Sequence, residues 1–214
     1  MIAGLDTSTP STAVAVLSPP LELRDDPGPG ERPRHAERLL PLLEQALERS
    51  GGSWDAVERL CVGVGPGGFT GLRLGIATAR ALAQARAIPL VGVSSLEALA
   101  APHAAALAVI DARRGEVFAA GWRDGERFLD PVAIAPAALA AQVVPGMLAI
   151  GDGAVKFRVE LERAGASIPA DGSPAHRVSA LEVCRLGAAG DAADRDALLP
   201  DYRREPDAKP RPLP

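Results

Sequence analysis

Cysteine is scarce in this sequence, and its scarcity excludes a disulfide framework. The 214 residues contain only two cysteines, Cys61 in an apolar strand-like run and Cys184 in a helical one, and they form no CxxC pair. Small secreted proteins that depend on disulfides carry several cysteines at close spacing. We therefore expect both thiols to lie in the core of a protein from a reducing compartment.

The sequence also lacks a hydrophobic run long enough to cross a membrane. Its most apolar stretch, LEALAAPHAAALAVI, is interrupted by Pro102 and His103. It is shorter than the ~18 to 20 uninterrupted apolar residues that a span needs. Near the start, Asp6 interrupts the apolar segment that a secretory signal would require. These features predict a cytoplasmic protein with no membrane partner.

Aromatic residues and excess positive charge are missing as well. The chain has one Tyr, two Trp and four Phe, a formal net charge of −4 and a pI near 5.5. Few side chains can stack on bases, and the acidic balance does not attract a phosphate backbone. We expect any contact with RNA to depend on a partner protein.

No short motif encodes a common hydrolase, Walker or zinc-protease site. GxSxG, a GK[ST] P-loop and HExxH are all absent. His35 would need a second histidine four residues later to share a metal on one helix face, and that position holds Leu39. His103 and His176 have no ligand-type neighbours at metal spacing. We predict no metal, no cofactor and no catalytic residue.

The order of the expected elements indicates two similar halves. Each half begins with three short strands and continues with alternating helices and strands. In the first half we expect strands at 2–5, 12–17, 21–23, 60–64 and 89–93, and helices at 35–49, at 70–87 and after Ser94, which caps with Glu97. In the second we expect strands at 107–111, 116–122, 126–129 and 147–150, and helices at 136–142, 154–164 and 180–188. The sequence thus predicts an α/β fold of two βββαβα-type halves, 1–102 and 103–200, with a proline-rich tail at 201–214.

Two short motifs carry the residues of a nucleotide site in reduced form. In GLDTSTPSTAVAV, a strand ending in Asp6 turns into the next strand, as in the phosphate-binding hairpin of sugar kinases, Hsp70 and actin. This turn has no glycine, however, and Pro10 has no N–H to donate. The polar residues could instead only stabilise a turn. The predicted nucleotide remnant comprises Asp6, Thr7, Ser8, Gly151 and Gly153.

The run GVGPGGFTGLRLGIATARALA passes from a strand through a glycine-rich turn into a helix. Such a turn could receive an anion at the helix N-terminus. The helix repeats small residues at every fourth position, and these could pack on the chain's own sheet or let a second helix approach closely. Its further apolar flank favours an intermolecular contact. The expected partner interface is His35, Leu39, Leu43, Thr70, Gly71, Leu72, Gly75, Ile76, Ala79 and Ala83.

Taken together, these motifs resemble the TsaB (YeaZ) family. The resemblance spans nearly the whole chain and rests on LDTSTPSTAVAV, HAERLLPLLEQAL, GVGPGGFTGLRLGIATARALA with PLVGVSSLEALA, DARRGEVFAA and DYRREPDAK. It implies the tandem actin-like (ASKHA, ribonuclease H-like) fold. The segment DARRGEVF, which places charges at a strand end, could border a cleft.

The resemblance also implies a role. Members are non-catalytic subunits of the bacterial machinery that makes threonylcarbamoyladenosine (t6A) at position 37 of ANN-decoding tRNAs. The helices at 35–49 and 70–87 would contact the catalytic subunit TsaD, or a second copy of the chain when TsaD is absent. TsaE would join the same complex, and tRNA would bind only through it. The alternative is an active ATPase or small-molecule kinase of the same superfamily, with Asp6 near Mg²⁺.

Overall fold

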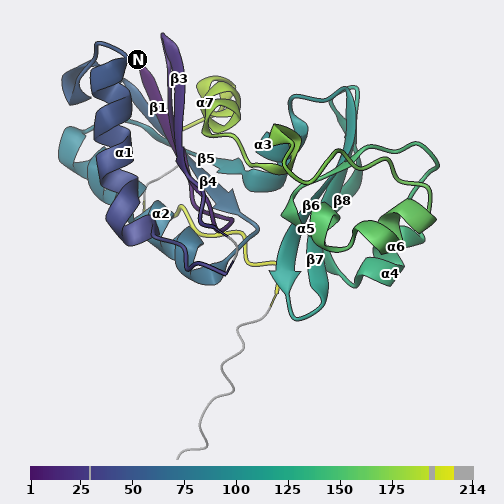
Figure 1. Ribbon diagram of the computed structural model, residues 1–214. Coiled ribbons are helices and arrows are strands. Elements are labelled where there is room, and N and C mark those ends of the chain that lie inside the picture. The colour runs from purple at the N-terminus through teal and green to yellow at the C-terminus, as the bar shows by residue number, and fades with distance from the viewer. Residues whose placement is uncertain (29, 193–195, 205–214) are drawn as a thin grey trace, which may run out of the picture.

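Two lobes, each built on one β-sheet, make up the protein (Figure 1). The computed structural model describes residues 1–28, 30–192 and 196–204. The sheet of the first lobe has the strand order β3-β2-β1-β4-β5. Strands β1, β2 and β3 form an antiparallel meander, and β4 and β5 continue the sheet parallel to β1. Their bounds are β1 Ile2–Asp6, β2 Thr12–Leu17, β3 Pro20–Asp25, β4 Arg59–Gly65 and β5 Leu90–Ser94.

The sheet of the second lobe repeats this arrangement with fewer strands. Its order is β8-β7-β6-β9, again an antiparallel meander whose first strand pairs in parallel with the fourth strand. The bounds are β6 Ala105–Arg113, β7 Glu116–Arg123, β8 Glu126–Ile134 and β9 Ala149–Ile150. Asp124 and Gly125 form the expected β7–β8 turn, with φ of 52° and 80°. The predicted tandem actin-like α/β fold is confirmed.

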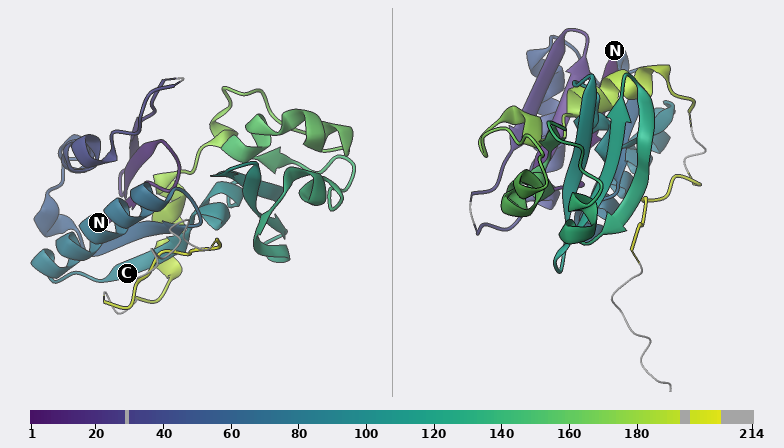
Figure 2. Two further views of the ribbon diagram at one scale, coloured as in Figure 1. Left: turned by 90° about the horizontal axis from the view of Figure 1, so that it is seen from below. Right: turned by 90° about the vertical axis from the view of Figure 1, so that its right-hand side faces the viewer.

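Three helices cover the two faces of the first sheet. Helices α1 (His35–Arg49) and α2 (Phe69–Arg86) lie side by side on one face, and α7 (Ala180–Ala189) covers the other (Figures 1 and 2). The contact with α7 is close, because a Cβ on Gly4 would lie 2.5 Å from Cys184 Sγ. The sequence placed α7 with residues 103–200, but it packs on the first sheet. The chain passes from the first sheet to the second near residue 102. The hydrophobic core does not divide there, because residues from both halves of the chain pack in one cluster.

Helix α3 (Ser95–Ala100) joins the lobes. Its Leu96 and Leu99 belong to one apolar cluster with residues of β4, β5, β6 and β7. The Ser94 side chain caps it by accepting from Glu97 N at 3.4 Å, as predicted. Because this cluster is continuous, the two lobes share part of their hydrophobic core.

The remaining helices belong to the second lobe. They are α4 (Pro136–Ala140), α5 (Asp152–Lys156) and α6 (Arg158–Arg163), and they pack with the sheet around an apolar cluster that includes Leu139 and Leu161. The single helix predicted at 154–164 is in fact two helices, since α5 ends at Lys156 and α6 begins at Arg158, with Phe157 between them. Short 3₁₀ turns lie at η1 (Trp54–Ala56) and η2 (Pro174–His176).

Both cysteines are buried and free, as predicted. Burial raises the pKa of the Cys61 thiol to about 12 and also raises the pKa of Cys184. None of the helices in the described part of the chain is long and apolar enough to cross a membrane. Of the predicted tail at 201–214, only residues 201–204 are described, and the rest lies outside the described residues.

Candidate functional site

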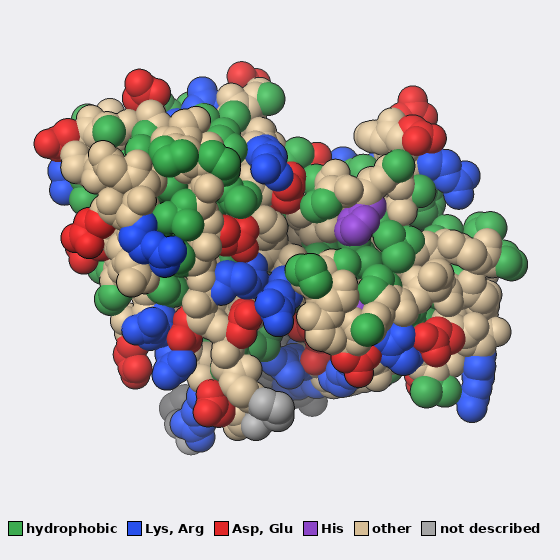
Figure 3. All heavy atoms as spheres, turned by 45° about the horizontal axis from the view of Figure 1, so that its top comes forward, with side chains coloured by type: hydrophobic (Ala, Val, Ile, Leu, Met, Phe, Trp, Pro, Cys, Tyr) green, Lys and Arg blue, Asp and Glu red, His purple; other side chains and the backbone are tan. Residues whose placement is uncertain are grey.

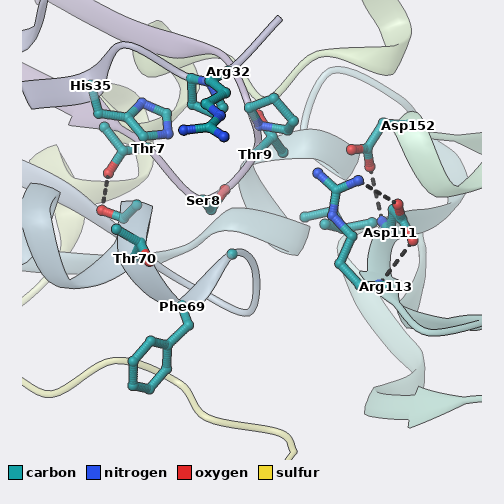
Figure 4. A pocket seen from close by; sticks show the side chains of 15 residues that line it. Thr7, Ser8, Thr9, Arg32, His35, Phe69, Thr70, Asp111, Arg113 and Asp152 are labelled. Atoms are coloured by element: carbon teal, nitrogen blue, oxygen red, sulfur yellow. Dashed lines mark hydrogen bonds and ion pairs between the residues drawn. The ribbon is translucent and has the colours of Figure 1, made fainter. Parts of the chain in front are cut away.

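A cleft of about 590 Å³ lies between the two lobes (Figure 4). The first lobe contributes the β1–β2 turn at 7–10, the loop at 32–33 with His35, and the start of α2 at 68–71. The second lobe contributes the end of β6 at 110–113 and Asp152 of α5. The expectation that DARRGEVF borders a cleft is confirmed by Asp111 and Arg113.

Asp6 does not face this cleft. Its carboxylate is 1% exposed and accepts hydrogen bonds from within the first lobe. Oδ1 accepts from Ser8 N at 2.9 Å and Ser8 Oγ at 2.7 Å, and Oδ2 accepts from Ser95 Oγ at 2.7 Å. A Cβ on Gly63 would lie 1.9 Å from Oδ2, so β4 closes over the carboxylate. The two oxygens of Asp6 thus fix the β1–β2 turn to the start of α3, and Asp6 does not line the cleft.

The glycine-rich turn before α2 is occupied by the protein's own backbone. Gly68 N donates to Ser8 O at 2.7 Å, and a Cβ on Gly67 would lie 2.2 Å from the same oxygen. An N–H at a helix start is the group that would receive a phosphate. Here the Ser8 carbonyl takes that position, so these glycines allow two turns of the chain to approach closely.

The small residues of α2 pack on the protein's own sheet and turn. Thr7 Oγ1 donates to Gly71 O at 2.8 Å, while a Cβ on Gly71 would lie 2.1 Å from Thr7 O and one on Gly75 2.2 Å from Thr7 Oγ1. Close approach by small residues was predicted, but the neighbour is the chain itself. Thr70 alone of the expected interface residues is exposed. The others are buried within the chain, namely His35, Leu39, Leu43, Gly71, Leu72, Gly75, Ile76, Ala79 and Ala83.

His35, the first residue of α1, is buried. Its Nδ1 lies 2.8 Å from Thr12 Oγ1, which fixes the ring against β2. Burial lowers the pKa of His35, and the nearby carboxylates of Asp6 and Asp25 oppose this shift. Leu39 stands one turn further along the helix. Among the described residues, no group of three His, Cys, Asp or Glu side chains could hold a metal ion.

On the second-lobe side of the cleft, the carboxylates of Asp111 and Asp152 form hydrogen bonds and an ion pair. Asp111 pairs with Lys156 Nζ at 2.9 Å and accepts from Arg113 N at 2.9 Å, and Asp152 accepts from Asp111 N at 3.0 Å. Burial is the main reason that the pKa of Asp152 is raised. Figure 4 shows Asp111, Arg113 and Asp152 facing the hydroxyl residues of the first lobe across the cleft.

The two glycines of the GDG turn are packing residues. A Cβ on Gly151 would lie 2.1 Å from Val109 O, and one on Gly153 would lie 2.9 Å from Ile110 C. They let α5 sit against β6, and neither of them lines the cleft. The predicted nucleotide remnant therefore places only Thr7 and Ser8 on the cleft wall.

Sequence reasoning missed several residues of this region. Arg32, Phe69 and Asp152 line the cleft, and Ser95 binds Asp6 from 89 positions along the chain. Arg32 stands in a loop outside any motif, and Phe69 lies within the glycine-rich motif but was not singled out, because the prediction rested on the glycines and Thr70 around it. The contact of Ser95 depends on how β4 and β5 lie beside β1, and no local pattern could have indicated it.

Helices α1 and α2 also leave an exposed apolar surface, which we call the outer face. On α1 it comprises Leu40, 46% exposed, and the exposed Pro41. On α2 it comprises the exposed Ala77 and Ala81, with Leu74 half-buried beside them. Positions 74, 77 and 81 share one side of a helix because they are three and four residues apart. The outer face thus lies on a different side of α2 from the small residues predicted to meet a partner, Gly71, Gly75, Ala79 and Ala83.

Comparison with known proteins assigns a family to this architecture. A family model described as TsaD, tRNA N6-adenosine threonylcarbamoyltransferase, matches residues 31–182. The structure of YeaZ from Pseudomonas aeruginosa superimposes with a TM-score of 0.75 at 28% identity, covering 94% of this chain and 98% of that chain. The chain belongs to the TsaB (YeaZ) family.

Two curated TsaB proteins agree with this assignment. The tRNA threonylcarbamoyladenosine biosynthesis protein TsaB of Bacillus subtilis is 28% identical over 225 residues, which covers 97% of this chain and 96% of that protein. TsaB of Escherichia coli is 36% identical over 133 residues, covering 59% of this chain and 55% of that protein. The similarity to YeaZ and to B. subtilis TsaB extends over both lobes, so the cleft and the outer face lie within the regions compared.

Proposed function

We propose that this protein is a non-catalytic subunit in t6A biosynthesis. It binds TsaD through the outer face of α1 and α2, and TsaD transfers the threonylcarbamoyl group to N6 of adenosine 37 in ANN-decoding tRNAs. TsaE joins the same complex. In the absence of TsaD, two copies of the chain pair through the same face. The names of the TsaB relatives support the pathway, and the match to the TsaD family supports a related partner.

The single observation that carries this proposal is the exposed outer face. Helices α1 and α2 already cover one side of the first sheet with buried leucines and alanines. Leu40, Pro41, Ala77 and Ala81 are left over on the opposite side. Alanines at this spacing let another helix approach closely, and exposed apolar surface of this kind is typical of an interaction site.

The state of the nucleotide motifs supports a non-catalytic role. A kinase or ATPase of this fold needs an acidic group at the cation and an open turn for the phosphates. In this chain the Asp6 oxygens accept from Ser8 and Ser95, and the Ser8 carbonyl occupies the glycine turn. Both features disfavour the alternative of an active ATPase or small-molecule kinase.

Charge distribution supports binding of tRNA only through the complex. The formal net charge is −4. On the face shown in Figure 3, Lys and Arg side chains are interspersed with Asp and Glu and do not gather into one basic patch. Binding to a phosphate backbone depends on clustered cations, so the chain alone offers it little.

The proposal is tested by placing a charge on the outer face. We expect Ala81→Arg to weaken association with TsaD from the same genome by about ten- to a hundredfold, because a bulky cation in a close helix contact costs roughly 1–3 kcal/mol and ~1.4 kcal/mol is tenfold in affinity. The melting temperature should stay at the parent value, since Ala81 is exposed. Titration calorimetry measures the first quantity and circular dichroism the second.

The matched control is Ala138→Arg. It makes the same change at an exposed alanine of α4 in the second lobe, and we expect it to bind TsaD like the parent. If the parent chain does not bind TsaD at all, the proposed partner is wrong. If the parent binds and Ala81→Arg binds equally well, the partner stands and the outer face is rejected.

A further inference from the structure

The last described residues, 196–204, run along α2 and then cross to the second lobe (Figure 1, yellow). Three contacts fix them to the first lobe. Asp196 pairs with Arg80 of α2 at 3.1 Å, and Asp201 N donates to Val64 O of β4 at 2.8 Å. Between them Leu198 packs over β5, where a Cβ on Gly92 would lie 2.6 Å from its Cδ1.

An aromatic cluster is a further anchor of the segment on α2. The Tyr202 and Phe69 rings lie 5.5 Å apart between centroids. The Arg73 guanidinium lies 3.7 Å from the centre of the Phe69 ring, and its Nε donates to Tyr202 Oη at 2.7 Å. Ring–ring and cation–π contacts of this kind stabilise a packed segment beyond the burial of the rings. The segment therefore runs antiparallel to α2, with Asp196 near its end and Tyr202 at its start.

Two arginines then reach the second lobe. Arg203 donates to Pro131 O of β8 at 3.3 Å, and Arg204 donates to Ala112 O of β6 at 2.9 Å and pairs with Glu116 of β7 at 3.5 Å. Ala112 stands between Asp111 and Arg113, both of which line the cleft. The segment is thus bonded to α2 on one side and to the strand that forms the cleft wall on the other.

We propose that residues 196–204 are an interlobe strap that restrains the second lobe relative to the first and so sets the width of the cleft. Elsewhere the lobes are joined by the apolar cluster around α3 and by the segment that leads into α7, where Arg24 donates to Val178 O at 2.9 Å. The strap adds a separate connection beside the start of α2, where Phe69 reaches the cleft rim. Its arginine contacts with the second lobe are partly exposed, and such contacts are worth little individually. The strap therefore limits how far the two lobes can move apart, while the α3 cluster keeps them joined.

The strap is independent of the proposed docking to TsaD. Phe69, Arg73 and Arg80 are four and seven residues apart and share one side of α2. Leu74 and Ala81 lie about 100° further round the helix, and Ala77 stands between the two sides. Arg203 and Arg204, the residues changed in the test below, contact the second lobe and not the outer face. The strap can therefore be tested in the isolated protein, and its failure would leave the outer face untouched.

The test measures a distance between the lobes. Spin labels are attached to cysteines replacing the exposed Glu37 of α1 and Glu160 of α6, while Cys61 and Cys184, which are fully buried, stay unlabelled. We expect Arg203→Ala combined with Arg204→Ala to broaden the distance distribution towards longer values. This double variant keeps Leu198 and Tyr202 on the first lobe and removes the second-lobe contacts of both arginines, together with the Arg203–Asp201 ion pair within the strap.

The matched control is Arg49→Ala combined with Arg163→Ala, two exposed arginines outside the strap that remove the same charge. It should keep the parent distribution. A chain ending at residue 204 should keep it as well, because the strap is complete. The proposal is overturned if the Arg203 and Arg204 variant retains the parent distribution, if the control broadens equally, or if the chain ending at 204 broadens too.

Discussion

At the scale of single residues, the polar groups near the cleft act mainly on one another. Asp6 is buried, and a buried carboxylate is tolerated only when its oxygens are hydrogen-bonded. Ser8 and Ser95 supply those bonds. Thr7 is occupied in the same way by the Gly71 carbonyl. Asp6, Thr7 and Ser8, which resemble a phosphate site, thus join the β1–β2 turn to α2 and α3 through their own hydrogen bonds.

His35 gives this region a pH dependence. Its pKa is lowered from 6.5 because burial penalises the charged ring, so the unfolded chain binds the proton more readily than the folded protein. The stabilisation is present above pH 6.5 and is lost as the pH falls towards the lowered value. We expect His35→Asn, whose amide can still bond Thr12, to show a smaller drop in melting temperature between pH 7.5 and 5.5 than the parent. Equal drops in the two proteins would contradict this assignment.

At the scale of elements, α2 has two apolar sides with different neighbours. Gly71, Gly75, Ala79 and Ala83 face the first sheet and its turn, whereas Ala81 faces outward. A small residue at every fourth position indicates close packing on one side of a helix, but it does not say whether the neighbour is a sheet or a partner. In the isolated chain these predicted interface positions pack on the protein's own sheet and turn.

One pair of substitutions separates the two sides of α2. Ala79 is fully buried, and Ala79→Leu should lower the free energy of unfolding by about 1–3 kcal/mol, because the added carbons have no space against the sheet. In a protein of this size each kcal/mol corresponds to about 2–4 °C in melting temperature. Ala77→Leu makes the same change at an exposed position and should leave the melt within about 1 kcal/mol of the parent. Equal melting temperatures for Ala79→Leu and Ala77→Leu would show that the buried side of α2 accommodates a larger side chain.

The elements themselves follow closely from local patterns. Apolar spacing and caps predicted the bounds of α1 and the Ser94 cap of α3, and the Asp124-Gly125 pair predicted the β7–β8 hairpin. The break at Phe157 between α5 and α6 carries no glycine or proline that could have revealed it. The Ser95–Asp6 bond and the position of α7 depend on contacts between distant segments, which no window of sequence contains.

At the scale of the whole molecule, the two halves of the chain complete each other. The side of the first sheet opposite α1 and α2 presents Gly4, Ala13, Ala15 and Cys61, which are small enough for a helix to lie close. That helix is α7, from the end of the chain. The strap returns to the same lobe a second time. The first sheet therefore depends on segments that follow the second sheet in sequence.

This dependence predicts that residues 1–102 do not fold alone, although they contain a complete five-stranded sheet. Without α7 one apolar side of the sheet faces water, and α3 loses its neighbours in β6 and β7. Each Å² of apolar surface buried on that side contributes roughly 25 cal/mol to stability. A lobe of about 100 residues is only marginally stable, so losing this burial should unfold it. We expect circular dichroism of the fragment to show no cooperative melt. Joining residues 177–190 to it through a flexible linker should restore one, because α7 then covers Gly4, Ala13 and Ala15 again. A fragment 1–102 that melts cooperatively without α7 would show that the first lobe folds independently and that the later segments only dock on it.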